Sequence, residues 1–190
     1  MYDEIDDPYC YPGTSVLKNI PGFDNQAALD AFEAASTMQR ADEALPSGRL
    51  TPAHYRSIHR HLFQDVYEWA GRFRTVRLSK GKSAFCYPEH IEREVKKLFS
   101  RMKSRLFFRG LSAGQFAREA AEFLSELNAI HPFREGNGRT QLTFLTLLAD
   151  QAGHPLDLEK LNANRFLQSM VLSFRGDITP LMHDMRALIN

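Results

Sequence analysis

The chain has 190 residues, of which 43% are hydrophobic and 25% are charged, a composition typical of one soluble globular domain. Its formal net charge of +1 at pH 7 excludes a global attraction to nucleic acid or to a membrane surface. No apolar run approaches the roughly 20 residues that span a bilayer, and the acidic N-terminus differs from a secretory signal. Cys10 and Cys86 fall in no metal-ligand spacing, so we expect reduced thiols in a cytoplasmic protein.

Residues 1–23 are predicted to form an irregular arm, because proline and glycine recur there too often for a long helix. Apolar residues at helical spacing then predict one helix over residues 25–44 and a second over 52–71, with Thr51 as the N-cap of the second. The second helix carries His59. We expect a packing or solvated histidine there rather than a metal ligand, because the histidine two positions later points to another face of the helix.

Residues 73–87 carry the only strand signal in the chain and are predicted to form a short β-hairpin. Apolar and polar residues alternate within residues 73–78, and residues 79–83 have the composition of a turn. Because an isolated hairpin is marginally stable in water, we expect it to lie on the helical body with one edge open. An open edge can accept an extended segment of another protein by strand addition. The alternative is a structural clip with no partner.

Helices are predicted for most of the remaining chain. A helix that begins at Pro88 has a basic second half, which we interpret as a solvated face rather than a nucleic-acid site. A capping box at residues 112–115 opens a helix that ends near Ile130, and a mostly apolar helix follows from about Asn137. Two or three more helices complete residues 1–190, which we expect to form a single all-α domain of six to eight helices with one hairpin.

Residues 131–139 read His-Pro-Phe-Arg-Glu-Gly-Asn-Gly-Arg, a poor sequence for any regular element. The residue types suit phosphate chemistry. Backbone N–H groups of residues 136–138 can form an anion-binding nest at the positive end of the next helix, and Arg139 can grip phosphate oxygens. Glu135 is a ligand of the kind that Mg²⁺ takes beside substrate phosphates, and His131 can accept a hydroxyl proton near neutral pH. The alternative is a glycine-rich connector with a few solvated charges.

This loop resembles the Fic motif, His-x-Phe-x-(Asp/Glu)-Gly-Asn-Gly-Arg-x-x-Arg, and matches every specified position from His131 to Arg139. The last arginine of the motif is replaced by Leu142. The irregular arm and the hairpin extend the resemblance over most of the chain, and the hairpin is similar to the flap that holds the target segment in Fic proteins. The matching flap residues are Ser79, Lys80, Gly81 and Phe85.

The resemblance implies the Fic fold and a protein adenylyltransferase. Such an enzyme transfers AMP from ATP to a Ser, Thr or Tyr hydroxyl of a target protein (AMPylation) and releases pyrophosphate. His131 is then the catalytic base, and Glu135 holds a Mg²⁺ ion that bridges the α- and β-phosphates. The Asn137 side chain is expected near the α-phosphate, and Arg139 is expected to grip the terminal phosphates. The implied nucleotide-binding residues are Gly136, Asn137, Gly138 and Arg139.

Leu142 sets this chain apart from the motif. In the family, the arginine at that position contacts the γ-phosphate and pairs with the glutamate of an inhibitory helix. Losing a charge-assisted contact costs roughly 1.5–3 kcal/mol, so we expect weaker ATP binding or an altered nucleotide preference. Another arginine, such as Arg165 or Arg175, can take its place only if the fold brings it near.

Neither end of the chain carries the Ser/Thr-x-x-x-Glu pattern of the inhibitory helix. The chain therefore resembles the Fic class whose inhibitor is a separate small antitoxin. The catalytic chain of that class acts as a bacterial toxin in the cytoplasm, and DNA gyrase and topoisomerase IV are the targets that the resemblance implies. We expect no direct nucleic-acid or membrane partner. The alternative use of such a domain is in a secreted effector that modifies host proteins.

Two other functions stay open from the sequence. One is a Fic-fold binding module of weak or no activity that docks a partner on its flap, although the presence of both His131 and Glu135 argues against it. The other is a transferase with a different donor, which moves phosphate, UMP or phosphocholine. The intact Gly-Asn-Gly-Arg run argues for AMP transfer, but no residue of the sequence identifies the base.

Overall fold

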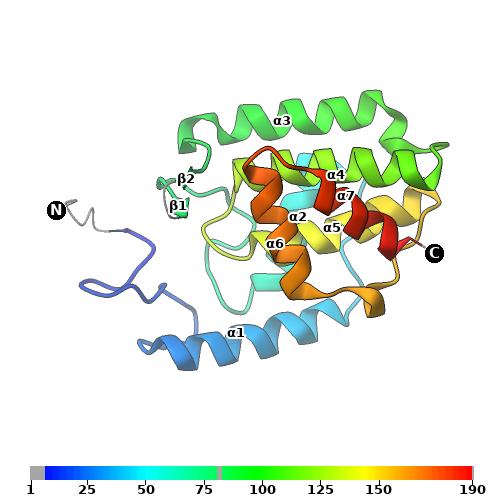
Figure 1. Cartoon of the computed structure of the whole chain (residues 1–190). Coiled ribbons are helices and arrows are strands. Elements are labelled where there is room, and N and C mark those ends of the chain that lie inside the picture. Colours follow the sequence, from blue (N-terminus) through cyan, green and yellow to red (C-terminus); the bar gives the residue numbers. More distant parts are fainter. Residues whose placement is uncertain (1–6, 81–82, 190) are drawn as a thin grey trace.

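The computed structural model describes residues 7–80 and 83–189. Within these residues the chain forms seven α-helices, two short 3₁₀ helices and one two-stranded hairpin (Figure 1). The α-helices are α1 (Gln26–Ala41), α2 (Pro52–Phe63), α3 (Pro88–Ser104), α4 (Ala113–Ile130), α5 (Asn137–Ala152), α6 (Ala163–Phe174) and α7 (Thr179–Leu188). The strands are β1 (Ser79–Lys80) and β2 (Ser83–Ala84), and the 3₁₀ helices are η1 (Leu106–Phe108) and η2 (Leu158–Lys160). The predicted all-α class is confirmed.

The helices are arranged in layers with α5 at the centre. Helix α4 packs against α3, α5, α6 and α7, while α2 packs against α1, α3 and α5. Figure 1 shows α1 and α3 at opposite edges of the molecule, with α2, α4 and α5 between them. Eight of the 16 residues of α5 are buried, as its mostly apolar sequence predicts. No helix within the described ranges is both long and apolar enough to cross a membrane.

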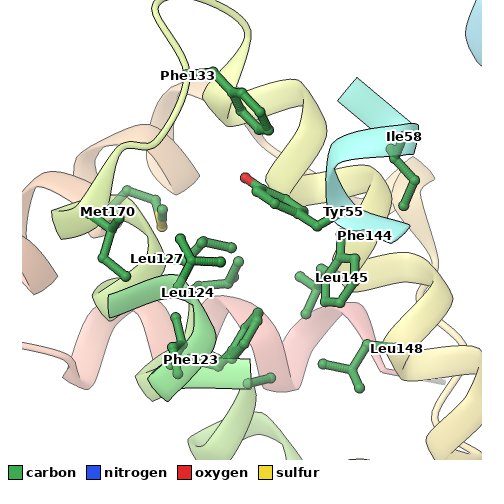
Figure 2. Close-up of a cluster of buried hydrophobic side chains, with 14 of the residues drawn as sticks. Tyr55, Ile58, Phe123, Leu124, Leu127, Phe133, Phe144, Leu145, Leu148 and Met170 are labelled. Atoms are coloured by element: carbon green, nitrogen blue, oxygen red, sulfur yellow. The ribbon is translucent and has the colours of Figure 1, made fainter. Parts of the chain in front are cut away.

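The hydrophobic core reaches up to the loop between α4 and α5. Phe133 of this loop is fully buried and points toward Tyr55 of α2, with the ring centroids 5.3 Å apart (Figure 2). Phe144 of α5 meets the same tyrosine ring edge-on at 5.5 Å, and Leu124 and Leu127 of α4 close the cluster from the other side. Burying a phenylalanine side chain contributes about 1.5–3 kcal/mol, so Phe133 anchors the loop to the rigid core.

The predicted helix starts are accurate and one predicted end is wrong. Asn25 caps α1 by accepting the N–H of Ala28 at 3.1 Å, and Thr51 caps α2 in the same way. Helix α2, however, ends at Phe63 and not at Gly71. The N–H of Gly71 donates to a side chain of α2, the Nδ1 atom of His59, at 2.8 Å, so the chain has already turned back there.

The hairpin lies where the sequence predicts it but is shorter. Its strands pair antiparallel over two residues each, in the register Ser79 opposite Ala84. The predicted strand over 73–78 is wrong: only the Leu78 carbonyl bonds across the hairpin, where it accepts the N–H of Phe85 at 3.1 Å, and the rest of this segment forms no strand. The N–H of Arg74 donates to the Pro132 carbonyl at 2.9 Å, and the N–H of Cys86 donates to an α4 carbonyl at 3.1 Å. The predicted flap residue Gly81 lies outside the described residues.

The arm contains no helix between residues 7 and 25 and lies against the body of the protein. Its Tyr9 ring meets the Trp69 ring edge-on with the centroids 5.5 Å apart, and the N–H of Ile20 donates to the Val66 carbonyl at 2.9 Å. These contacts hold the arm beside the turns that follow α2. The arm therefore reaches the neighbourhood of the loop that connects α4 with α5.

Candidate active site

The loop between α4 and α5 has a backbone shape that its residues impose. Pro132 disfavours helical geometry in the residue before it, and α4 accordingly ends with His131 in the left-handed conformation, at φ 48° and ψ 62°. Gly136 has a φ of 78°, and a Cβ atom there would lie 2.3 Å from the ring of Phe63. Only glycine therefore fits at position 136, which begins the turn into α5.

The Asn137 side chain holds the loop together. Its Oδ1 atom accepts the N–H of Phe133 at 2.9 Å, and its Nδ2 atom donates to the Phe133 carbonyl at 2.8 Å. The residue is 3% exposed. The structure therefore gives the amide of Asn137 a bracing contact inside the loop, in addition to the phosphate contact that the sequence predicts.

His59 of α2 supports the loop between α4 and α5. Its Nδ1 atom accepts the Gly71 N–H, so Nε2 carries the proton and donates to the Glu135 carbonyl at 3.0 Å. The imidazole lies between the rings of Phe63 and Phe133, with centroids 4.7 and 3.8 Å away, and burial lowers the pKa of His59 to about 4. His59 is thus a packing residue, as expected, and its bond to the loop is a role that the sequence does not indicate.

A cavity of about 810 Å³ opens beside this loop, between the hairpin, α5 and α6. Six of the predicted site residues line it: Ser79, Phe85, His131, Glu135, Asn137 and Gly138. Its far wall is mostly apolar and comes from α6, with Phe166, Leu167, Met170, Val171 and Phe174. Among the described residues, Gly136 and Arg139 are not part of the cavity lining. The fold therefore brings most of the predicted site together around one cavity.

The imidazole of His131 is oriented within this cavity by Phe85. The two rings are stacked, with centroids 4.0 Å apart and an angle of 15° between their planes. Phe85 in turn meets Phe174 of α6 edge-on at 5.6 Å. The main-chain carbonyl of His131 accepts a hydrogen bond from Arg74 Nε at 2.8 Å. Both the ring and the backbone of His131 are thus held in place.

The N-terminus of α5 faces the cavity and suits an anion. The first N–H groups of a helix have no acceptor within the helix and carry the positive end of its dipole. Gly138, in the first turn of α5, is exposed and lines the cavity. Of the three residues of the predicted nest, Asn137 and Gly138 therefore line the cavity beside His131, whereas Gly136 does not.

Glu135 is the candidate metal ligand. One of its carboxylate oxygens accepts the Gly136 N–H at 2.8 Å, and its side chain is 45% exposed. The described residues contain no cluster of three or more His, Cys, Asp or Glu side chains that could enclose a metal ion. A single exposed carboxylate fits Mg²⁺, which takes one or two protein carboxylates and fills its remaining positions with phosphate oxygens and water.

Comparison with known proteins shows the family of the chain. Residues 49–149 match the Fic/DOC family. The chain is 53% identical over 189 residues to a probable protein adenylyltransferase, y4lH, from Sinorhizobium fredii. The matched region covers 99% of this chain and 98% of that relative. The chain belongs to the Fic/DOC family.

Solved Fic-domain structures share the whole fold. BepC from Bartonella tribocorum, crystallised with bound AMPPNP, superposes with a TM-score of 0.87 at 26% identity over 96% of each chain. The N-terminal Fic domain of a Bartonella quintana protein with bound ADP gives 0.87 at 30% identity, over 96% of this chain and 94% of that one. The predictions of a Fic fold and of a nucleotidyltransferase of the protein adenylyltransferase kind are confirmed.

Arg139, the last matching residue of the Fic motif, points to α1 and not into the cavity. Its Nη2 atom donates to Glu33 Oε1 at 2.5 Å and its Nη1 atom to Thr37 at 3.3 Å, while the guanidinium lies 4.7 Å from the Phe63 ring centroid. The second oxygen of Glu33 accepts the Tyr67 hydroxyl, and burial, together with this hydrogen bond, raises the pKa of Tyr67. The same Nη2 atom of Arg139 also lies 3.5 Å from Glu135 Oε1, so Arg139 is paired with the candidate metal ligand as well as with Glu33.

The place of the missing Fic arginine is apolar. Leu142 lines the cavity one turn into α5. Of the two candidate replacements, Arg165 is paired with Asp184 at 2.6 Å and lies outside the lining, whereas Arg175 is exposed and lines the cavity. Arg134 also lines the cavity and is paired with a carboxylate of the arm.

Proposed function

We propose that the chain transfers AMP from ATP to a Ser, Thr or Tyr hydroxyl of a protein and releases pyrophosphate. The observation that carries the proposal is the cavity that joins His131, Glu135 and the N-terminus of α5 beside the flap hairpin. A base, a metal ligand and an anion-binding helix end are the three components that nucleotidyl transfer needs. The nucleotides bound to the related Fic structures support a nucleoside triphosphate as the donor.

His131 is the proposed catalytic base. A protein hydroxyl is a weak nucleophile until its proton is removed, and an imidazole accepts that proton near neutral pH. The hydroxyl oxygen then forms a bond to the α-phosphorus, and the bond between this phosphorus and the bridging oxygen of the β-phosphate breaks. The stack with Phe85 fixes the plane of the imidazole relative to the attacking oxygen.

The residues from Glu135 to Gly138 are proposed to hold the phosphates. The N–H groups in the first turn of α5 would bind phosphate oxygens, and Glu135 would hold Mg²⁺ together with them. Bound Mg²⁺ offsets the negative charge on the leaving pyrophosphate. Asn137 keeps these groups in fixed relative positions because its amide bonds to the main chain of Phe133. Arg139 would join them once it is released from Glu33.

The hairpin is the proposed docking edge for the target. Ser79 and Phe85 line the cavity on its hairpin side, so a segment added along β1 would pass directly over His131. Lys80 completes β1. Strand addition binds mainly through main-chain hydrogen bonds, so the identity of the target depends on side chains beyond this edge.

The biological setting that we propose follows the family resemblance. The chain would act in the bacterial cytoplasm as the toxin of a toxin–antitoxin pair, restrained by a separate small antitoxin with an inhibitory helix. DNA gyrase and topoisomerase IV are the first targets to test. Co-expression with a neighbouring small open reading frame tests the pair, because a true antitoxin would abolish both growth arrest and labelling of a target.

A second candidate is transfer of a different group from a different donor. It is favoured by two observations, the apolar Leu142 in the cavity and the engagement of Arg139 with Glu33. Both reduce the positive charge available to the outer phosphates of ATP. A donor with fewer charged groups beyond the α-phosphate would depend less on these arginines.

A labelling experiment tests the proposed function. The purified chain is incubated with Mg²⁺, α-labelled ATP and a bacterial lysate, and parallel reactions contain γ-labelled ATP, α-labelled UTP or α-labelled GTP. We expect protein labelling with α-labelled ATP that is absent with γ-labelled ATP and lost in His131→Ala. His61→Ala is the matched control, because His61 binds the Arg40 carbonyl at 2.7 Å, outside the cavity.

Each other result has a definite meaning. Labelling with another nucleotide would keep the mechanism and change the donor. Labelling that survives in His131→Ala would show that a different residue is the base. If a folded chain freed of bound inhibitor labels no protein with any donor, the proposal of nucleotidyl transfer would be abandoned in favour of a binding module.

A further inference from the structure

Arg74 is a buried cation that the proposed chemistry does not use. The residue is 2% exposed, and it forms no ion pair within the part of the chain that the structure describes. Burying a guanidinium without a carboxylate is costly unless its donors are satisfied in another way. Burial accordingly lowers the pKa of Arg74. The contacts of Arg74 must therefore offset the cost of removing its charge from water.

Those contacts are four main-chain carbonyls from two separate parts of the site. Nε donates to His131 at 2.8 Å and Nη2 to Ile130 at 3.2 Å, which are the last carbonyls at the end of α4. Nη1 donates to Val76 at 2.6 Å and Nη2 also donates to Cys86 at 2.7 Å, and these two residues lie in the segments that precede and follow the hairpin strands. The planar guanidinium can serve four acceptors at once because it carries five N–H donors in fixed directions.

The contacts stabilise the charge and also connect the two parts. The C-terminal carbonyls of a helix carry the negative end of its dipole, which favours a cation at this place. The backbone N–H of Arg74 donates to Pro132 at 2.9 Å, so main chain and side chain both reach the motif loop. The carbonyl of Cys86 directly follows Phe85, the residue whose ring stacks on His131. One side chain thus fixes the backbone of His131 and the ring that orients its imidazole.

We infer that Arg74 is a positioning residue that locks the flap hairpin and His131 into one unit, so that the docking edge and the base keep a fixed distance. The inference rests on the proposed function, in which the hairpin presents a target hydroxyl to His131. Arg74 touches neither the N-terminus of α5 nor Glu135, so nucleotide binding does not depend on it. Its loss therefore acts on the transfer step and leaves nucleotide affinity unchanged.

The test compares Arg74→Lys and Arg74→Gln with the control Arg56→Gln. Lysine keeps the charge but cannot span four carbonyls from one point. Arg56 is a fair control because its Nε atom also donates to a carbonyl, that of Gly71, at 2.8 Å, and its guanidinium lies 5.2 Å from the Phe73 ring centroid. It contacts neither the hairpin strands nor His131, so its replacement reports the cost of losing a nearby, exposed arginine that also donates to a main-chain carbonyl.

Three quantities are measured on each folded variant. They are the affinity for AMPPNP by calorimetry, kcat for protein labelling, and the hydrogen exchange of the Cys86 amide, which donates to the Ala129 carbonyl at 3.1 Å. For both Arg74 variants we expect AMPPNP affinity within about threefold of the wild type, kcat lowered about 100-fold, and exchange at least about tenfold faster. Arg56→Gln should leave all three within about threefold, whatever its melting temperature.

The outcomes separate this inference from the proposed function. If the wild type does not label any protein, the proposed function fails, while exchange and AMPPNP affinity still decide the role of Arg74. Wild-type exchange and kcat in Arg74→Lys would overturn the inference. So would an equal loss of kcat in Arg56→Gln, because the effect would then be a general loss of stability.

A measurement on the wild type covers the case in which the variants do not fold. Native-state exchange in rising denaturant gives the opening free energy of each amide. If Arg74 locks the two parts together, the amides of Cys86 and His131 open with the same free energy and the same denaturant dependence. If the hairpin amide opens at a lower free energy than the amide of His131, the two parts move separately and the inference is wrong.

Discussion

The ring of Phe85 lies flat against the imidazole of His131, with centroids 4.0 Å apart and an interplanar angle of 15°. This contact joins the flap hairpin to the Fic motif, and it shows that the hairpin does more than present an edge to a target. A stacked ring limits rotation of the imidazole, and a base must keep its nitrogen aimed at the attacking oxygen. In the proposed function, the flap would therefore contribute to the chemistry as well as to docking.

Replacing Phe85 by alanine should slow transfer without preventing nucleotide binding. The imidazole of His131 would lose its stacking partner and sample other rotamers, so we expect kcat for protein labelling to fall about tenfold. Phe85→Tyr keeps the stack and should retain most of the activity. Tyr87→Ala is the control, because Tyr87 is 45% exposed and stacks with Arg77 rather than with His131. An equal loss in Tyr87→Ala would contradict the orienting role of Phe85.

The sequence predicts the local parts of this molecule well. The cap at Asn25, the capping box of α4 and the break at Pro132 all follow from residue chemistry over a few positions, and the structure contains each of them. The loop of the Fic motif is recognisable because its residue types are unusual for any helix. The hairpin is predicted in the right place, but too long, because alternation cannot show that the backbone on either side of it bonds to α4 and to the loop after α4.

Contacts between distant positions have no such local signal. Arg139 and Glu33 are 106 positions apart, and His59 is 76 positions from the carbonyl that it binds. Helical periodicity shows that one face of a helix is buried, but not which polar side chain on that face meets a loop. Arg74 has the appearance of an ordinary surface arginine within an alternating segment. Only the fold shows that the motif arginine is engaged and that Arg74 is buried.

Neutralising Glu33 should free Arg139 for the nucleotide. In Glu33→Gln the guanidinium loses the nearer of its two carboxylate partners and keeps only Glu135 at 3.5 Å, so we expect affinity for ATP to rise about threefold to tenfold. The free energy of unfolding should fall by about 1 kcal/mol, because Arg139 is 40% exposed and its ion pair is partly screened. Calorimetric titration and urea unfolding measure the two effects. Glu43→Gln, which removes an exposed partner of Arg40, should change neither by a comparable amount.

Restoring the motif arginine should change nucleotide preference. In Leu142→Arg a cation would enter the cavity at the position that Leu142 now lines, so we expect the affinity ratio of ATP to ADP to rise about tenfold or more. Leu142→Met keeps the position apolar and should leave the ratio unchanged. Titration of both nucleotides into the three proteins measures the ratio. If the ratio stays the same in Leu142→Arg, the outer phosphate does not reach this part of the cavity.

His59 should make the stability of the protein depend on pH. Its pKa is lowered from 6.5 to about 4 in the folded state, so between these values the unfolded chain binds the extra proton. The stabilisation is complete above pH 6.5 and is lost as the pH falls toward 4, which at pH 5 removes about 2 kcal/mol. His59→Gln does not titrate, so urea unfolding at pH 7 and pH 5 should show a smaller difference for the variant than for the wild type. Equal pH differences for the two proteins would mean that His59 is protonated or solvent-exposed in the folded state.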